Sequence, residues 1–235
     1  MPLVFSALPL AADDEPIISI GFHENTQILP PPNDEFCPRD TLLQNDDGQF
    51  ENAYMWRLEG VVPPDYSCFA ERYDATYVCG IQLYLTSDGS QFDNQTLDLY
   101  LWQSVLEDGP NPIPGNIICS RIMIEPGPIA TWPEISVHQL SMNCCVDGAH
   151  FAGYWGNWPF NQQEGWYVAA DEASDTTNAR SATKVFPGLG YGSGWVPINE
   201  IFPNCKNLGI REMARDRCSP WPTKTTSWGK IKSLY

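Results

Sequence analysis

The chain has 235 residues, of which 43% are hydrophobic, so it is long enough to bury a core, and wholesale disorder is excluded. Its 21 prolines and 18 glycines favour short strands over long helices. The 29 aromatic side chains (nine Trp, ten Tyr and ten Phe) also favour strands because aromatic rings suit pleated surfaces. The formal net charge of −16 repels phosphate backbones and argues against a nucleic-acid partner.

Residues 1–40 are expected to form an extended N-terminal arm. Residues 2–12 are apolar and end in small residues, as in the hydrophobic region of a signal peptide, but no basic segment precedes them. We therefore expect either a signal remnant or an added first strand. Residues 18–22 are a candidate strand, and the three consecutive prolines at 30–32 exclude a helix. No run approaches 18 apolar residues, so we expect no membrane span.

The body of the chain shows apolar and polar residues in alternation, which is typical of strands half buried in a core. Strands are predicted at 76–87, 96–103, 116–124, 134–145, 165–172 and 207–214. In the second, Leu97, Leu99 and Leu101 are expected to point inward and Asp98, Tyr100 and Trp102 outward. Within 134–145 the apolar phase changes, which predicts a β-bulge near His138 and Gln139.

This pattern predicts an all-β fold, with two antiparallel sheets packed face to face in a β-sandwich of jelly-roll type. We expect the sandwich to occupy residues 41–218. Residues 1–40 would then form the arm, and residues 219–235 a basic C-terminal tail.

Several short segments occur in an order that resembles a known kind of domain. They are DDGQFENAYMW (46–56), YVCGIQLYLT (77–86), LDLYLWQ (97–103), PGNII (114–118), GWYVAADE (165–172) and FPNCKNLGIRE (202–212). Over about residues 44–215 the chain resembles an uncharacterised, jelly-roll-like β-sandwich domain of exported bacterial proteins. The closing SWGKIKSLY resembles a Trp-Gly-x-Ile-Lys-type tail found on some exported bacterial proteins. The resemblance implies export and a sandwich fold, and it implies no activity.

The eight cysteines are even in number, which favours disulfides over a metal site. No Cys-x-x-Cys pair is present, and the three histidines are scattered. Cys144 and Cys145 are adjacent, so in a strand they point to opposite faces and need different partners. The other pairings stay open among Cys37, Cys68, Cys79, Cys119, Cys144, Cys145, Cys205 and Cys218.

Two acidic loops, 45–52 and 171–178, carry the carboxylate and amide oxygens that calcium takes as ligands. Asp46, Asp47 and Glu51 are the candidate first ligands of a Ca²⁺ cofactor. The alternative is that Asp and Asn stand there as turn-forming residues.

Residues 154–167 are rich in aromatic side chains, and Trp155, Trp158 and Trp166 are candidates for stacking on the apolar faces of sugars. The alternative is that most of these rings fill the core. No Gly-x-Ser-x-Gly motif is present, and pairs of carboxylates are expected by chance in so acidic a chain. We therefore nominate no catalytic residue.

Charge is distributed unevenly along the chain. Residues 211–235 hold six basic and two acidic residues, a net of +4, which leaves −20 for the other 210. Within the tail, apolar and basic residues alternate in a candidate interaction segment: Trp228, Lys230, Ile231, Lys232 and Leu234. Such a segment is typical of a docking peptide, although intramolecular docking, a sorting signal and a disordered tail are alternatives.

From these observations we expect a secreted, non-enzymatic structural or adhesive protein of the cell surface. It would assemble with copies of itself through its termini into a homo-oligomer or filament. A carbohydrate-binding module with glycan partners is the first alternative, and a glycoside-acting enzyme is the second.

Overall fold

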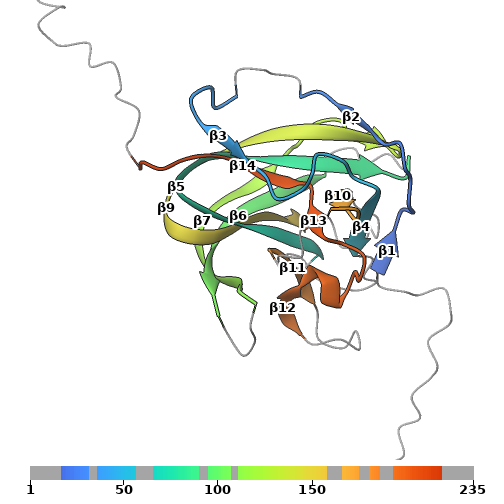
Figure 1. Cartoon of the computed structure of the whole chain (residues 1–235). Coiled ribbons are helices and arrows are strands. Elements are labelled where there is room, and N and C mark those ends of the chain that lie inside the picture. The colour runs from blue at the N-terminus through green and yellow to red at the C-terminus, as the bar shows by residue number, and fades with distance from the viewer. Residues whose placement is uncertain are drawn as a thin grey trace, which may run out of the picture.

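The structure is a computed structural model, and it describes residues 17–31, 36–56, 66–89, 95–106, 111–157, 166–174, 180–185 and 193–218. The strands are β1 (Ile17–Ser19), β2 (Gln27–Leu29), β3 (Thr41–Leu43), β4 (Asn52–Trp56), β5 (Tyr66–Ser87), β6 (Thr96–Val105), β7 (Ile113–Ile124), β8 (Ala130–Thr131), β9 (Glu134–Asn157), β10 (Tyr167–Asp171), β11 (Ser181–Val185), β12 (Gly194–Pro197), β13 (Asn207–Leu208) and β14 (Ile210–Arg215). A single 3-10 turn, η1 (Ile198–Glu200), interrupts them, and the described part of the chain contains no α-helix. The predicted all-β class is confirmed (Figure 1).

Two long strands, β5 and β9, hold the two layers of the sandwich together. They pair antiparallel along most of their length, and the register shifts between Ala75 and Tyr77 and again between Val78 and Gly80. Such bulges bend a strand pair, and Figure 1 shows β5 and β9 curving together from one layer into the other. The two layers are therefore parts of one continuous sheet, and this sheet does not close on itself.

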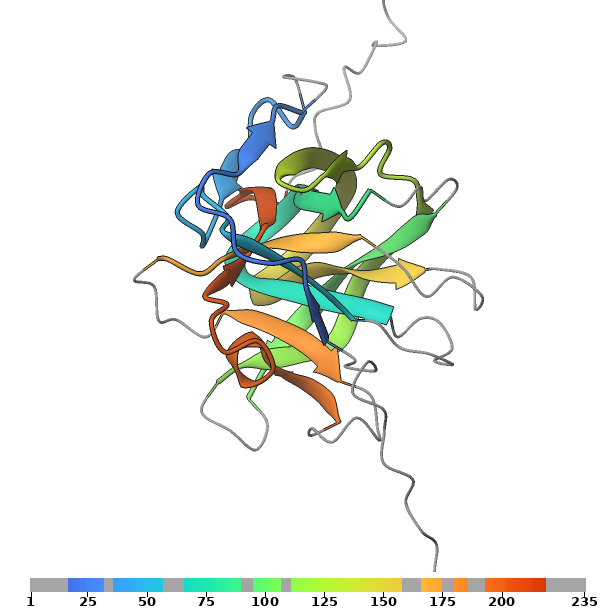
Figure 2. The ribbon, with the colours of Figure 1, turned by 90° about the vertical axis from the view of Figure 1, so that its right-hand side faces the viewer.

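The remaining strands attach to either half of this bent pair. Beyond the bend, β14 and β10 pair with β5, while β3, β4, β1 and β13 continue outward and β2 pairs with β9. Before the bend, β11 and β12 extend from β5, and β6 and β7 extend from β9. Figure 2 shows β11 and β12, in orange, at one end of the molecule beside the green β7. All pairs are antiparallel except β2 with β9 and β5 with β8.

The predicted bulge near His138 and Gln139 is wrong. Pairing with β5 is regular there, and β9 gains its extra residue further on, where Asn143 has a φ of 55°. The apolar phase changes because both faces of the sheet are covered at this point. Val137 packs in a cluster on one face, whereas Leu140 belongs to the main core on the other.

The main core lies between the layers, and its buried members include Leu97, Leu99 and Leu101, which confirms their inward orientation. The three residues predicted to point outward lie on the opposite face of β6, as expected, but they too are buried. Tyr100 and Trp102 belong to a second aromatic cluster. Its aromatic members are Tyr100, Trp102 and Phe151, with the half-buried Trp155 and Trp195 packed against them.

Small residues on the neighbouring strands make room for these rings. Ala70 and Ala182 belong to the same cluster, and Gly153 lies opposite Tyr100 in the pairing of β9 with β6. A Cβ on Gly153 would collide with the backbone of Phe69 and Ala70, so β9 and β5 approach closely here because this residue is glycine. Alternation of residue types therefore separated the two faces of β6, but it did not show that both faces are buried.

Part of the predicted arm belongs to the sandwich. β1 pairs with β4, and β2 pairs with β9, so both strands add to the sheet. Cys37 is also bonded to Cys79 of β5. Residues 1–16 and the tail 219–235 lie outside the described residues, and so do the predictions that rest on them.

Six cysteines form three disulfides: Cys37–Cys79, Cys119–Cys144 and Cys145–Cys218. The prediction that Cys144 and Cys145 have different partners is confirmed. Two of the eight candidate disulfide cysteines need correction, because Cys68 and Cys205 are buried thiols. Cys68 belongs to the second aromatic cluster and Cys205 to the main core, so the two thiols lie in different clusters.

Candidate functional site

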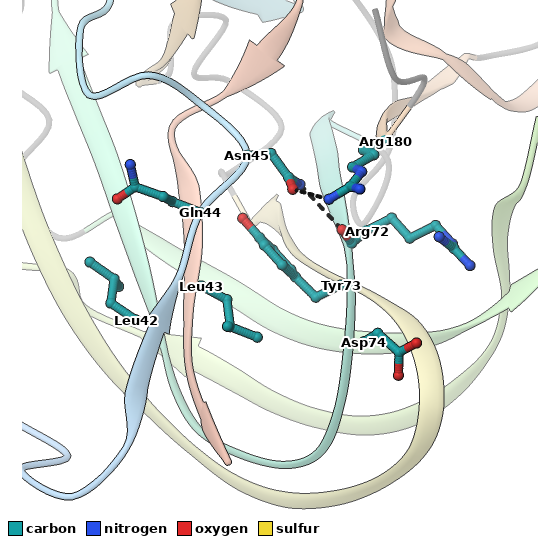
Figure 3. Close-up of a pocket in the computed structure, with 8 residues that line it drawn as sticks. All are labelled: Leu42, Leu43, Gln44, Asn45, Arg72, Tyr73, Asp74 and Arg180. Atoms are coloured by element: carbon teal, nitrogen blue, oxygen red, sulfur yellow. Dashed lines mark hydrogen bonds between the residues drawn. The ribbon is translucent and has the colours of Figure 1, made fainter. Parts of the chain in front are cut away.

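A pocket opens along one edge of β5, where the pairing of strands is interrupted. On the side away from β9, β11 pairs with β5 up to Glu71, and β14 resumes the pairing at Tyr77. The gap between them forms part of a pocket of about 470 Å³, which we call the β5 pocket. Its lining residues are Leu42, Leu43, Gln44, Asn45, Arg72, Tyr73, Asp74 and Arg180 (Figure 3).

Figure 3 shows the two sides of the β5 pocket. Leu42 and Leu43 of β3 lie on one side of the Tyr73 ring, and the side chains of Arg72, Arg180 and Asp74 lie on the other. Tyr73 itself is buried, and its hydroxyl donates to the carbonyl of Ile210 at 2.5 Å. The pocket therefore combines an apolar wall with a charged rim.

Asn45 connects the rim to a buried acid. Its Oδ1 accepts a hydrogen bond from Nη1 of Arg180 at 2.8 Å, and its Nδ2 donates to Oε2 of Glu71 at 2.8 Å. Nδ2 also donates to the carbonyl of Arg72 at 3.2 Å. These contacts fix the amide orientation, so Asn45 holds Arg180 in place without neutralising its charge.

Glu71 is fully buried beneath the pocket. It accepts hydrogen bonds from the backbone N–H of Leu208 at 2.7 Å, from Asn45 and from the Ser181 hydroxyl. Burial raises the pKa of Glu71 to about 7, although these three donors oppose the rise. Its carboxyl group therefore titrates close to neutral pH, directly behind the rim.

A second buried acid, Asp46, is paired with Arg211. Nε of Arg211 donates to Asp46 at 3.0 Å and Nη2 forms a second, parallel hydrogen bond, while Nη1 donates to the Tyr84 hydroxyl at 2.6 Å. The guanidinium also lies over the Tyr84 ring at 4.4 Å. Burial alone would lower the pKa of Arg211, but the carboxylate of Asp46 holds that pKa above its usual range.

His150 and Glu212 form a third buried polar pair. Nε2 of His150 lies 2.8 Å from Oε1 of Glu212, and Nδ1 lies 2.7 Å from the carbonyl oxygen of Gly148. Burial raises the pKa of Glu212. Burial alone would lower the pKa of His150, but the hydrogen bond and charge of Glu212 raise it. The pair therefore shares a proton within the fold.

The structure brings the two predicted calcium loops together, but it gives the three candidate ligands separate roles. Asp46 is bonded to Arg211, Asp47 accepts the backbone N–H of Gln49 at 2.9 Å, and Glu51 accepts that of Glu172 at 2.8 Å. Carboxylates that accept backbone N–H groups are typical of turns. Among the described residues, the only three potential metal ligands that converge are Cys37, Asp40 and Cys79, and a disulfide joins the two cysteines. Calcium at Asp46, Asp47 and Glu51 stays a prediction.

Two of the candidate sugar-stacking residues, Trp155 and Trp166, lie in different clusters. Trp166 is buried in the main core, whereas Trp155 is half buried in the second aromatic cluster, with Nζ of Lys184 4.6 Å from its ring centre. Trp158 lies outside the described residues. The rings of Trp155 and Trp166 therefore face different clusters. The number of tryptophans in the segment could not predict this difference in orientation.

The interaction residues of the tail, from Trp228 to Leu234, also lie outside the described residues. The residue that directly precedes the tail is described: Cys218 is bonded to Cys145 of β9. Within the described part of the chain, no helix has the length and apolar character required to cross a membrane.

Apart from Asn45 in the acidic loop 45–52, the residues of the β5 pocket carry no signal that was recognised in the sequence. Arg72 and Arg180 are 108 positions apart in the chain and belong to no motif. The available signal was the adjacent charged pair Glu71 and Arg72 inside a segment, 66–73, whose other residues are mostly aromatic or apolar. Comparisons with protein-family models, with curated proteins and with solved structures found no match to this chain, so the resemblance to an exported sandwich domain stays a prediction.

Proposed function

We propose that this chain is an exported, non-enzymatic structural protein of the cell surface, and that it assembles with copies of itself. In this proposal, residues 219–235 of one copy dock on strand β7 of another. The observation that carries the proposal is the exposed apolar edge formed by β7.

β7 is the last strand at one end of the sheet. Among the described residues it pairs only with β6, so its other edge is open to a further strand. The exposed fractions of Ile117, Ile122 and Met123 are 51%, 64% and 68%. Exposed apolar side chains along an unpaired edge are typical of a surface that another chain covers.

The attachment of the tail supports its assignment as the docking segment. Cys218 is bonded to Cys145, and the neighbouring Cys144 is bonded to Cys119 in the middle of β7. Cys218, the last described residue before the tail, therefore lies near a strand that pairs on one side alone among the described residues. A contact from the tail of one copy to β7 of the next is heterologous, and repetition of such contacts builds a filament.

The side chains of the two partners are complementary. Trp228, Ile231 and Leu234 supply apolar groups that match those on β7. Lys230 and Lys232 supply positive charge, and the exposed Glu125 follows β7 directly. The three disulfides favour an oxidising compartment, which agrees with an extracellular location.

Sedimentation velocity over a range of concentrations tests the proposal. Full-length protein is expected to form oligomers, and deletion of residues 219–235, which keeps Cys218, is expected to leave a folded monomer. Ile122→Lys should also yield monomer, because it places a charge on the open edge. Phe22→Lys is the matched control, since Phe22 is 61% exposed and lies away from β7, and it should assemble normally.

Two outcomes contradict the proposal. Full-length protein that stays monomeric at high concentration rules out assembly. Oligomers that survive both the deletion and Ile122→Lys show that assembly uses another surface. Raised salt should weaken the intact assembly, because ions screen the charges of the lysines.

A further inference from the structure

We propose that the β5 pocket binds a small ligand through one carboxylate group, which the guanidinium groups of Arg72 and Arg180 hold. This site is separate from β7, and it does not depend on assembly of the chain.

Among the described residues, no carboxylate neutralises either arginine. Arg72 donates from Nε to the hydroxyl of Ser104 at 2.9 Å, and Arg180 donates from Nη1 to Asn45, so both bond to neutral acceptors. Within the described residues, neither arginine forms an ion pair. A guanidinium carries five N–H groups, so each has donors left for a ligand. The chain has 29 acidic and 13 basic residues, so two arginines without a carboxylate partner in the described part of the chain are informative.

The protein positions one of these arginines in advance. Glu71 is buried and accepts from Nδ2 of Asn45, and Asn45 presents its Oδ1 to Arg180. This relay fixes Arg180 through a neutral amide and leaves its positive charge available. A side chain that is ordered before binding loses less conformational entropy when the ligand arrives.

The charge of the rim selects a monoanion. Arg72 and Arg180 contribute two positive charges, and the exposed Asp74 contributes one negative charge. Counted over the residues that line the pocket, the net charge of +1 suits a carboxylate better than a phosphate dianion, in a body that is itself strongly acidic. A guanidinium fork also matches the planar geometry of a carboxylate.

The opposite wall selects a ligand with an apolar part. Leu42 is exposed and Leu43 is half buried, and both line the pocket on β3. The volume of about 470 Å³ lies in the range of small-molecule sites. A short organic acid, or an acidic group on a larger apolar molecule, combines both features.

NMR titration of ¹⁵N-labelled full-length protein tests this site, with sodium hexanoate and hexanamide as probes. The two probes have the same shape but differ in charge. Hexanoate should shift the amide signals of Asn45, Arg72 and Asp74, and it should bind about tenfold or more tightly than hexanamide. Arg180→Gln and Arg72→Gln should each weaken hexanoate binding about tenfold or more. Arg121→Gln, an equal change of charge on β7, should bind hexanoate as the parent does.

Each alternative outcome overturns the proposal. No response of the three amides to hexanoate at tens of millimolar removes the site. Equal binding of hexanoate and hexanamide removes the role of the carboxylate, and equal binding by Arg180→Gln and Arg121→Gln removes the role of the rim. The monoanion assignment is overturned if inorganic phosphate displaces hexanoate at a lower concentration than hexanoate itself needs to bind. The dispersion of the amide spectrum shows whether each variant is folded.

Discussion

Arg211 and the arginines of the β5 pocket occupy contrasting surroundings. Arg211 is buried, forms two hydrogen bonds to Asp46 and lies over an aromatic ring. Arg180 is exposed and bonds to a neutral amide. The difference teaches that the buried polar groups of this fold are paired with one another, whereas the rim of the pocket leaves its positive charge available for a partner. Four predictions, arranged from the largest effect to the smallest, examine this contrast.

Asp46→Ala should cause the largest loss of stability, because it leaves the buried guanidinium of Arg211 without its carboxylate. Removing one partner of a buried ion pair costs about 3–5 kcal/mol of unfolding free energy. Denaturant unfolding measures this loss. Asp47→Ala is the matched control: Asp47 is exposed and bonds to a turn N–H, so its loss should cost about 1 kcal/mol or less. Equal losses in the two variants would refute the structural role of the Asp46–Arg211 pair.

Glu71 should make stability fall as the pH rises. Its pKa is raised from 4.5 to about 7 in the folded state, so the folded protein retains a proton that the unfolded chain releases. The stability from this group is present below about pH 4.5 and is lost as the pH approaches 7. At about 1.4 kcal/mol per pKa unit, the loss is on the order of 3 kcal/mol.

Unfolding free energies measured from pH 4.5 to 7 for the parent and for Glu71→Gln test this assignment. The variant cannot titrate at this position, so its stability should depend less on pH than that of the parent. Glu134→Gln, an exposed control, should retain the parental slope. Identical slopes for the parent and Glu71→Gln would show that another group is responsible.

Two buried tyrosines should respond in opposite directions when their hydroxyl groups are removed. The hydroxyl of Tyr154 is buried and has no hydrogen-bond partner among the described residues, so Tyr154→Phe should stabilise the fold by about 1 kcal/mol. The hydroxyl of Tyr73 donates to Ile210, so Tyr73→Phe should destabilise it by about 1 kcal/mol. Thermal melts compare the two variants directly, and changes of the same sign would contradict these assignments.

Arg180→Gln should have the smallest effect on stability. Arg180 is exposed and its side chain bonds only to Asn45 among the described residues, so the unfolding free energy should change by less than about 0.5 kcal/mol. The same variant should lose ligand binding, which separates a binding role from a structural one. A loss as large as that of Asp46→Ala would place Arg180 with the buried polar groups instead.

The sequence allowed most of the strands to be predicted, because alternation of apolar and polar residues follows directly from burial of one face. Prediction from alternation failed for the first part of β5, because Glu71 and Tyr73 point inward and break the expected apolar pattern. It also misplaced the bulge in β9, because alternation cannot show that both faces of a sheet are covered.

The site was harder to predict than the fold. Asp46 and Arg211 are 165 positions apart, and nothing local distinguishes a carboxylate that will bind an arginine from one that forms a turn. Asp46 was therefore predicted as a calcium ligand from the acidic composition of its loop alone. The β5 pocket depends on where β11 ends and β14 begins along β5, which is a property of the assembled sheet.

The adjacent cysteines of β9 also determine how the molecule would carry mechanical load. A pulling force applied to the chain beyond Cys218 passes through sulfur to Cys145, along one peptide unit to Cys144, and through sulfur again to Cys119 in β7. This path is covalent throughout, so the hydrogen bonds of β14 need not bear the force. Under tension, β14 would be shielded while β9 and β7 act as one tether, and reduction of Cys145–Cys218 would transfer the load to β14.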